Sequence, residues 1–329
     1  MKRFFLSIYI TFFAVFFCSA KSVPGWLKNP EKEFPEEKYI YATGKGNSEK
    51  SAQNSALANI SLYFDVKTDI VMRSVKELGE FQIDEKTHSV DSESYFQIND
   101  ISSSAEFFLV KFTESYYDKK TDTFSILAYI DRIEASQIYS MRIEGLLNSV
   151  RELKSSAKSE TEPFYVSQTL HKAEQIGRLA ENYIKCETTI IPENIEKYKT
   201  ELKTISEISR ERAELKKSLT FSIVMSPEEE KYSPVFTTVA SILEKNGYSY
   251  SLENSKYKIF INISGTEESY KAGEFVRLSL DVLVLNNSKN GVYTYSKAFD
   301  RTGGKTLEQA YILAINNIKN DLKENFLPE

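Results

Sequence analysis

The stretch from Tyr39 to Phe64 constrains the fold of this chain most, because it reads as a strand that turns directly into a helix. Its first residues alternate between aromatic or polar side chains and small or apolar ones, a period of two that predicts a half-buried strand. Gly44 and Gly46 allow the tight exit that such a corner needs, and Asn47 or Ser48 can cap the helix that follows. The sequence therefore predicts a strand, a glycine turn and a helix that packs on the sheet.

The same pattern recurs near the C-terminus. The helix after the first glycine turn has small side chains at every fourth position, which allows close packing against a sheet. Five positions match without gaps, since Gly46, Ser48, Ala52, Ala56 and Ile60 correspond to Gly304, Thr306, Ala310, Ala314 and Ile318. We interpret the following residues as a structural turn and helix-packing motif that is used twice: Gly44, Gly46, Ala52, Ala56, Gly304, Ala310 and Ala314. The alternative is that any helix lying closely on a sheet converges on this pattern.

Two further segments of the N-terminal part alternate in the manner of strands. They run from Ser104 to Tyr117 and from Thr123 to Asp131, with a polar turn between them, so we predict a β-hairpin with one buried face. Residues 66–78 fit either a strand or a continued helix, and we favour the strand. Residues 79–92 are polar and predict a loop.

A helical pattern fills the middle of the chain, from Ile133 to Leu219. Apolar residues fall at helical spacing there, glycine and proline are rare, and breaks occur at Glu162-Pro163 and at Pro192. We predict three antiparallel helices that form a connector. Their charged faces are expected to be solvated, and docking of a partner on this helical arm is the alternative.

Strand patterns return after this connector. Alternating apolar residues predict four strands that begin at Phe221, Tyr257, Val276 and Val292. A helix is expected from Pro234 to Asn246, closed by Gly247 at the position where a left-handed residue is favoured.

The fold class that follows is α+β, with two small sheet-plus-helix domains joined by an antiparallel helical connector. The expected boundaries are residues 1–20 for a signal peptide, 21–132 for the N-terminal domain, 133–218 for the connector and 219–329 for the C-terminal domain.

The N-terminus has the pattern of an export signal. Two basic residues precede an apolar run over residues 4–17, and Cys18-Ser19-Ala20 follows the run. The run is shorter than the roughly 20 residues that span a bilayer, which argues against a transmembrane anchor. Cleavage after Ala20 would release the chain, whereas cleavage before Cys18 would leave a thiol for lipidation. Phe17 is bulkier than the residue usual at such a lipidation site.

Few residues offer catalytic or metal-binding chemistry. The chain has two histidines, His88 and His171, and neither belongs to a nucleophile motif. The glycine turns lack the remaining residues of a phosphate-binding loop, and the net charge of -5 gives no reason to expect nucleic acid. Cys186 is expected to be a small buried side chain on a helix without a disulfide. We therefore expect no cofactor, no metal and no enzymatic activity.

The N-terminal part resembles a known family. Pro24-Gly25-Trp26, then YIYATGKG and a helix with alanine at every fourth position, is similar to the opening of the LPP-twenty family of bacterial envelope lipoproteins. The resemblance covers residues 23–133 and implies a non-enzymatic envelope role. The chain departs from the family in its helical connector, its second α+β domain and the residue before Cys18. We expect Trp26 to be an aromatic anchor packed on the first domain, with ligand stacking as the alternative.

These features predict an exported, non-enzymatic protein of a bacterial cell envelope, in the periplasm or anchored to the outer membrane. It would act as a binding or assembly factor whose partners are other envelope proteins, met through sheet edges or the helical connector. A lipid anchor at Cys18 is one of the two processing outcomes. The alternatives are a periplasmic ligand receptor or enzyme that uses an inter-domain cleft, and a subunit of an oligomeric secretion or motility structure.

Overall fold

The structure is a computed structural model that describes residues 22–64, 66, 103–224, 227–251, 255–271 and 273–327. The chain divides into two compact units, the first with Met1–Tyr63 and Phe108–Ile133 and the second with the rest. The export signal with Cys18, the strand expected over residues 66–78, and the loop over residues 79–92 with His88 lie outside the described residues. Each unit contains helices and a sheet, so the protein is α+β.

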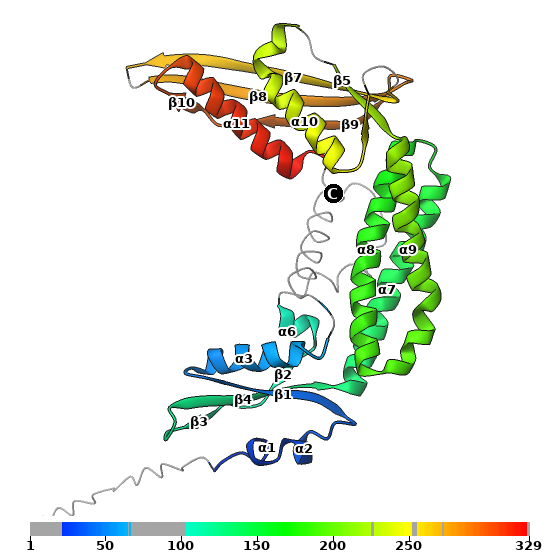
Figure 1. Cartoon of the computed structure of the whole chain (residues 1–329), viewed down its shortest axis with the longest axis vertical. Coiled ribbons are helices and arrows are strands. Elements are labelled where there is room, and N and C mark those ends of the chain that lie inside the picture. The colour runs from blue at the N-terminus through cyan, green and yellow to red at the C-terminus, as the bar shows by residue number, and fades with distance from the viewer. Residues whose placement is uncertain are drawn as a thin grey trace, which may run out of the picture. The chain divides into compact units, whose positions relative to one another are not determined.

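The first unit is built on an antiparallel sheet with the order β1-β4-β2, in which β3 also pairs with β4. Its strands are β1 (Tyr39–Gly46), β2 (Lys111–Phe112), β3 (Tyr116–Asp118) and β4 (Thr123–Asp131). Helix α3 (Glu49–Ser61) lies on one side of this sheet, and the short helices α1 (Gly25–Lys28) and α2 (Pro30–Glu33) lie on the other (Figure 1). The predicted strand, glycine turn and helix at Tyr39–Phe64 are therefore confirmed.

The predicted hairpin is correct for β4 and wrong for its partner. Ser104–Phe107 forms a helical turn, α6, and the chain then pairs with β4 through the two short strands β2 and β3. Adjacent Phe107 and Phe108 are both 0% exposed, which alternation on a one-sided strand cannot achieve. Leu109 follows with φ 57°, so the backbone leaves the extended conformation there.

The second unit begins with three long helices that run alongside one another (Figure 1). They are α7 (Arg132–Ser159), whose first two residues belong to the first unit, α8 (Pro163–Ile190) and α9 (Ile195–Ser218). Pro163 stands in the first turn of α8, and Pro192 opens the 3₁₀ turn η1 (Pro192–Asn194) before α9. The three predicted helices and both predicted breaks are confirmed.

The second unit continues into a sheet with the order β10-β8-β7-β5-β6, in which β9 also pairs with β8. Its strands are β5 (Thr220–Val224), β6 (Ser249–Tyr250), β7 (Tyr257–Tyr270), β8 (Gly273–Asn286), β9 (Gly291–Ala298) and β10 (Thr302–Gly304). Strand β5 pairs with β6 and β7 in parallel, and the other pairs are antiparallel. The four predicted strands are confirmed, whereas the short strands β6 and β10 were not predicted.

Helices α10 (Ser233–Lys245) and α11 (Leu307–Asn325) lie on the same side of this sheet (Figure 1). They are preceded by the 3₁₀ segment η2 (Pro227–Tyr232) and by β10, respectively. Burial alternates along the first half of β7, so one face of the strand packs under the helices and the other does not. Gly247 closes α10 with φ +79°, as the sequence predicts.

The helical segment is joined to this sheet by packing as well as by the chain. Phe164, near the start of α8, belongs to the core of the sheet and lies 6.3 Å from Phe221 and 5.9 Å from Tyr257, measured between ring centroids. The Glu162 carboxylate caps α8 and accepts hydrogen bonds from Tyr257 (2.5 Å) and Asn286 (2.7 Å). Helix α8 therefore begins inside the core of the C-terminal sheet.

Candidate functional site

The two glycine corners are places of close packing. A Cβ atom on Gly44 would lie 2.1 Å from the backbone nitrogen of Ala56, and one on Gly304 would lie 2.5 Å from that of Ala310. Ala52 and Ala56 are 0% exposed, as is Ala310, and Ala314 is 2% exposed. Backbone of α3 and α11 therefore occupies the space that a larger side chain would need.

Hydroxyl groups cap both helices in the same way. Ser48 Oγ accepts from the N–H of Ser51 at 3.2 Å, and Thr306 Oγ1 accepts from the N–H of Gln309 at 3.2 Å. A Cβ atom on Gly46 would lie 2.5 Å from Ser51 Oγ. These contacts give both corners a structural use.

The single tryptophan, Trp26, is 6% exposed within α1. Little of its ring is left for a ligand to stack on. Cys18 lies outside the described residues.

A buried carboxylate joins the three long helices. Glu187 of α8 is 0% exposed, and it accepts hydrogen bonds from Ser140 of α7 (2.7 Å), from Asn194 of η1 (2.8 Å) and from Tyr198 of α9. Ser136 lies 3.5 Å away. One side chain of α8 is therefore hydrogen-bonded to α7, η1 and α9.

A second charged cluster lies nearer the start of α8. Glu174 is 5% exposed and accepts from Arg212 of α9 (2.7 Å) and from Arg178 (2.6 Å). Burial alone would raise the pKa of this carboxyl, but the hydrogen bond from Arg212 and the charge of Arg178 lower it overall. Burial and the charge of Arg212 lower the pKa of the neighbouring His171 to about 3, so its ring is neutral at physiological pH.

The solvated faces expected for these helices are therefore interrupted by buried charge. Cys186 is a buried free thiol on α8, as predicted, and burial raises its pKa, which makes it a poor nucleophile. Among the described residues, no group of His, Cys, Asp and Glu is arranged to hold a metal ion. Nor does any helix of the described ranges combine the length and apolar character needed to cross a bilayer.

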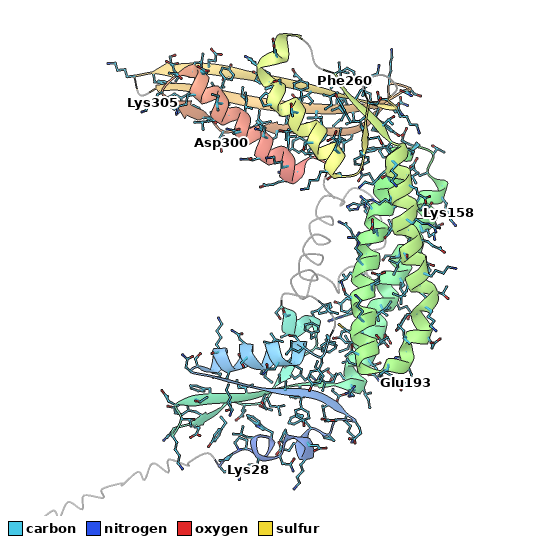
Figure 2. The ribbon with its side chains drawn as sticks, viewed as in Figure 1. Lys28, Lys158, Glu193, Phe260, Asp300 and Lys305 are labelled. Carbon is cyan, nitrogen blue, oxygen red and sulfur yellow. The ribbon has the colours of Figure 1, made fainter. Side chains whose placement is uncertain are left out.

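The C-terminal sheet has an open backbone edge along β7. Strand β5 pairs with β7 only from Tyr257 to Phe260, whereas β8 pairs with β7 along its whole length to Tyr270. Phe260, labelled in Figure 2, lies opposite Val224 at the end of β5. Past this point no described strand pairs with the other side of β7, over a length of about 30 Å.

The hydrogen-bond pattern shows which residues of β7 point outwards. The carbonyl of Leu278 in β8 accepts from the N–H of Phe299 at 2.9 Å, so the backbone polar groups of Leu278 point away from β7. Gly265 of β7 is the residue opposite Leu278. Two opposite residues of an antiparallel pair direct their backbone groups either towards each other or away from each other, so the N–H and C=O groups of Gly265 point away from β8. Because this direction alternates, Ile263, Gly265, Glu267 and Ser269 direct their N–H and C=O groups to the open edge.

Of these four residues Gly265, Glu267 and Ser269 are exposed, whereas Ile263 is 8% exposed. Residues 264–267 are all exposed, and among the described residues none hydrogen-bonds to the backbone of residues 263–269 from that side. An unpaired edge of this length is a template on which another chain can add a strand.

The outer strands β1, β6, β9 and β10 are protected. In β1 the carbonyl of Thr43, which points away from β4, accepts from Asn59 Nδ2 of α3 at 2.8 Å. Strand β9 has a β-bulge opposite Val284 and Leu285 and bears Lys297. Strands β6 and β10 have two and three residues. Short strands, bulges and lysines are the usual protections of an edge.

Two carboxylates mark the open edge of β7. Glu268 accepts from Arg301 (3.2 Å) and Tyr270 (2.9 Å), and Glu267 accepts from Tyr311 of α11 (2.6 Å). Residues 261–270 contain no lysine, arginine or proline. The sequence predicts β7 from its alternation but not this edge, because pairing with β5 depends on a segment more than 30 residues away.

No protein-family model matches the chain. No curated protein matches it either. Among solved structures the chain is similar to a minor lipoprotein from Acinetobacter baumannii, with a TM-score of 0.24 and 14% identity over 33% of this chain and 96% of that one. It is also similar to a secreted protein from Helicobacter pylori, with a TM-score of 0.30 and 12% identity over 88% of this chain and 98% of that one. TM-scores at this level do not establish a shared fold, so the resemblance to the LPP-twenty family stays a prediction.

Proposed function

We propose that this chain is a non-enzymatic, exported protein of a bacterial cell envelope that acts as a binding or assembly factor for other envelope proteins. The observation that supports the binding role is the open edge of β7, where the backbone groups of four residues point away from β8 and have no described partner. The buried carboxylates of Glu174 and Glu187 in the long helices, by contrast, already accept hydrogen bonds from side chains of neighbouring elements. Export rests on the basic residues, the apolar run and the small-residue exit at the N-terminus.

Mass spectrometry of the mature N-terminus tests whether the protein is exported and whether it is lipidated. A lipidated Cys18 would identify an anchored envelope lipoprotein, and a chain that begins at Lys21 would identify a released form. A cytosolic protein that retains residues 1–20 would contradict export altogether.

Photo-crosslinking in living cells tests the binding role. We would place a photoreactive amino acid at exposed Ser264 of β7 and, separately, at exposed Lys323 of α11. A crosslink from either position to an envelope protein identified by mass spectrometry supports the proposal. The absence of crosslinks from both positions, and from a scan of further exposed positions, would overturn it.

A further inference from the structure

We propose that the open edge of β7 binds an extended, basic segment of a partner protein, which adds a strand to the C-terminal sheet. This inference rests on the proposed binding function and names the class of partner. The segment would lie beside Asn262–Tyr270, beyond the end of β5. Main-chain hydrogen bonds to Ile263, Gly265, Glu267 and Ser269 would hold it, and side chains would select it.

The charges on β7 favour a basic segment. Side chains directly opposite each other on neighbouring strands lie about 5 Å apart, so an added strand would meet Glu267 and Glu268 first. Two cations near these carboxylates are held over aromatic rings of neighbouring elements. Arg301 lies 4.5 Å over the ring of Phe275 in β8, and Lys231 lies 4.6 Å over the ring of Tyr311 in α11.

The same charges disfavour a second copy of this chain as the occupant. Two β7 strands paired in parallel and in register would place each glutamate directly opposite its own counterpart, which is destabilising. An antiparallel pair would still gather four carboxylates on two adjacent strands. A partner with lysine or arginine at these positions has no such conflict.

The ends of the edge offer apolar contacts. Phe260 is 38% exposed where β5 ends, and Tyr270 is 54% exposed at the far end of β7. Both lie on the face of the sheet opposite α10 and α11, because they share the exposed side of the alternation. A basic segment with apolar residues near its ends therefore fits the edge best.

Peptide binding to the chain from Lys21 to Glu329 tests this inference. The probes are three fluorescein-labelled decapeptides: alternating Lys and Val, alternating Glu and Val, and the Lys-Val peptide with proline at its fifth residue. By fluorescence anisotropy we expect the Lys-Val peptide to bind about ten-fold more tightly than the other two. Equal binding of all three, or no binding, would overturn the inference.

Protein variants locate the binding. The double variant Glu267→Lys with Glu268→Lys should bind the Glu-Val peptide more tightly than the Lys-Val peptide, which reverses the order of the two affinities. The control Asp281→Lys makes the same kind of charge change at an exposed position on β8, one strand further from the edge, and should leave the order unchanged. Circular dichroism confirms that each variant is folded. An unreversed order would overturn the inference.

The remaining outcomes are also decisive. Concentration-dependent dimers that compete with the peptide would show that a second copy occupies the edge, and would overturn the basic partner. Envelope-protein crosslinks from positions outside β7, together with failed peptide binding, would leave the proposed function standing and overturn only this inference.

Discussion

Strand β1 and the second half of β7 show two kinds of sheet edge. Strand β1 lies so close under α3 that a helix side chain, Asn59, reaches the outward carbonyl of Thr43. Strand β7 extends far past β5, and no described side chain reaches its outward groups between Ile263 and Ser269. Close helix packing therefore closes one edge of this protein, and a strand longer than its neighbour opens another.

The largest expected effect comes from lifting α3 off β1. Gly44→Ala would place a methyl group 2.1 Å from the backbone nitrogen of Ala56, and backbone cannot move aside locally. We expect the free energy of unfolding of the first unit to fall by about 3 kcal/mol. Urea unfolding followed by the fluorescence of Trp26 measures this.

The matched control is Gly291→Ala, where a Cβ atom would meet its nearest neighbour at 3.6 Å, an ordinary contact. A Gly44→Ala variant with the stability of the original chain would contradict the close packing of α3.

Two separate proline substitutions test the direction of the backbone groups in β7. Thr266→Pro removes an N–H that points to β8 and should lower the free energy of unfolding by about 3 kcal/mol. Glu267→Pro removes an N–H that points to the open edge and should lower it by less than about 1 kcal/mol. Chemical unfolding followed by circular dichroism compares the two, with Glu267→Gln as the control for the lost charge. Equal losses would mean that the assigned direction is wrong.

The free energy of unfolding and the binding of a peptide to β7 should depend differently on pH. The pKa of His171 falls from 6.5 to about 3 through burial and the charge of Arg212. The contribution of neutral His171 to the free energy of unfolding is complete above pH 6.5. It is lost as the pH falls towards 3, because in this range only the unfolded chain takes up the proton.

We expect the free energy of unfolding to decrease by up to about 1.4 kcal/mol per pH unit between pH 6 and 5. His171→Gln should flatten this dependence relative to the original chain. Hydrogen bonds from Tyr270 and Arg301 lower the pKa of Glu268, so peptide binding should persist at pH 5. An unchanged slope in the His171→Gln variant would contradict the buried, neutral histidine.

The smallest effect is expected from opening the edge of β1. Asn59→Ala removes the hydrogen bond to the Thr43 carbonyl and should lower the free energy of unfolding by about 1 kcal/mol. Asn54→Ala, at another exposed position of the same helix, is the control. Trp26 fluorescence during urea unfolding measures both. No difference between the two variants would show that Asn59 does not protect this edge.

Local sequence patterns predict much of this fold. Each of these patterns is formed by residues that are close together in the sequence: the period of two in β4, β7 and β8, the small residues of α3 and α11, and the proline breaks of the long helices. The short strands β6 and β10 are different, because two or three residues carry no period of their own and depend on a neighbouring strand.

The polar groups that matter most were the least predictable. Glu174 and Glu187 look like parts of a solvated helix face, yet Arg212 and Ser140 bury them from 38 and 47 residues away. The open edge of β7 likewise depends on where a distant strand ends. Trp26, Gly44 and the alanines, by contrast, could be singled out from sequence because each belongs to a local pattern.

Residue-resolved amide hydrogen exchange, with and without the Lys-Val peptide, tests the open edge most directly. In the free protein the amides of Ile263, Gly265, Glu267 and Ser269 should exchange rapidly, while those of Ser264, Thr266 and Glu268 are protected by β8. The peptide should then protect the first group and leave the second unchanged. Uniform protection along β7 in the free protein, or no protection of the first group by the peptide, would contradict an edge that accepts a strand.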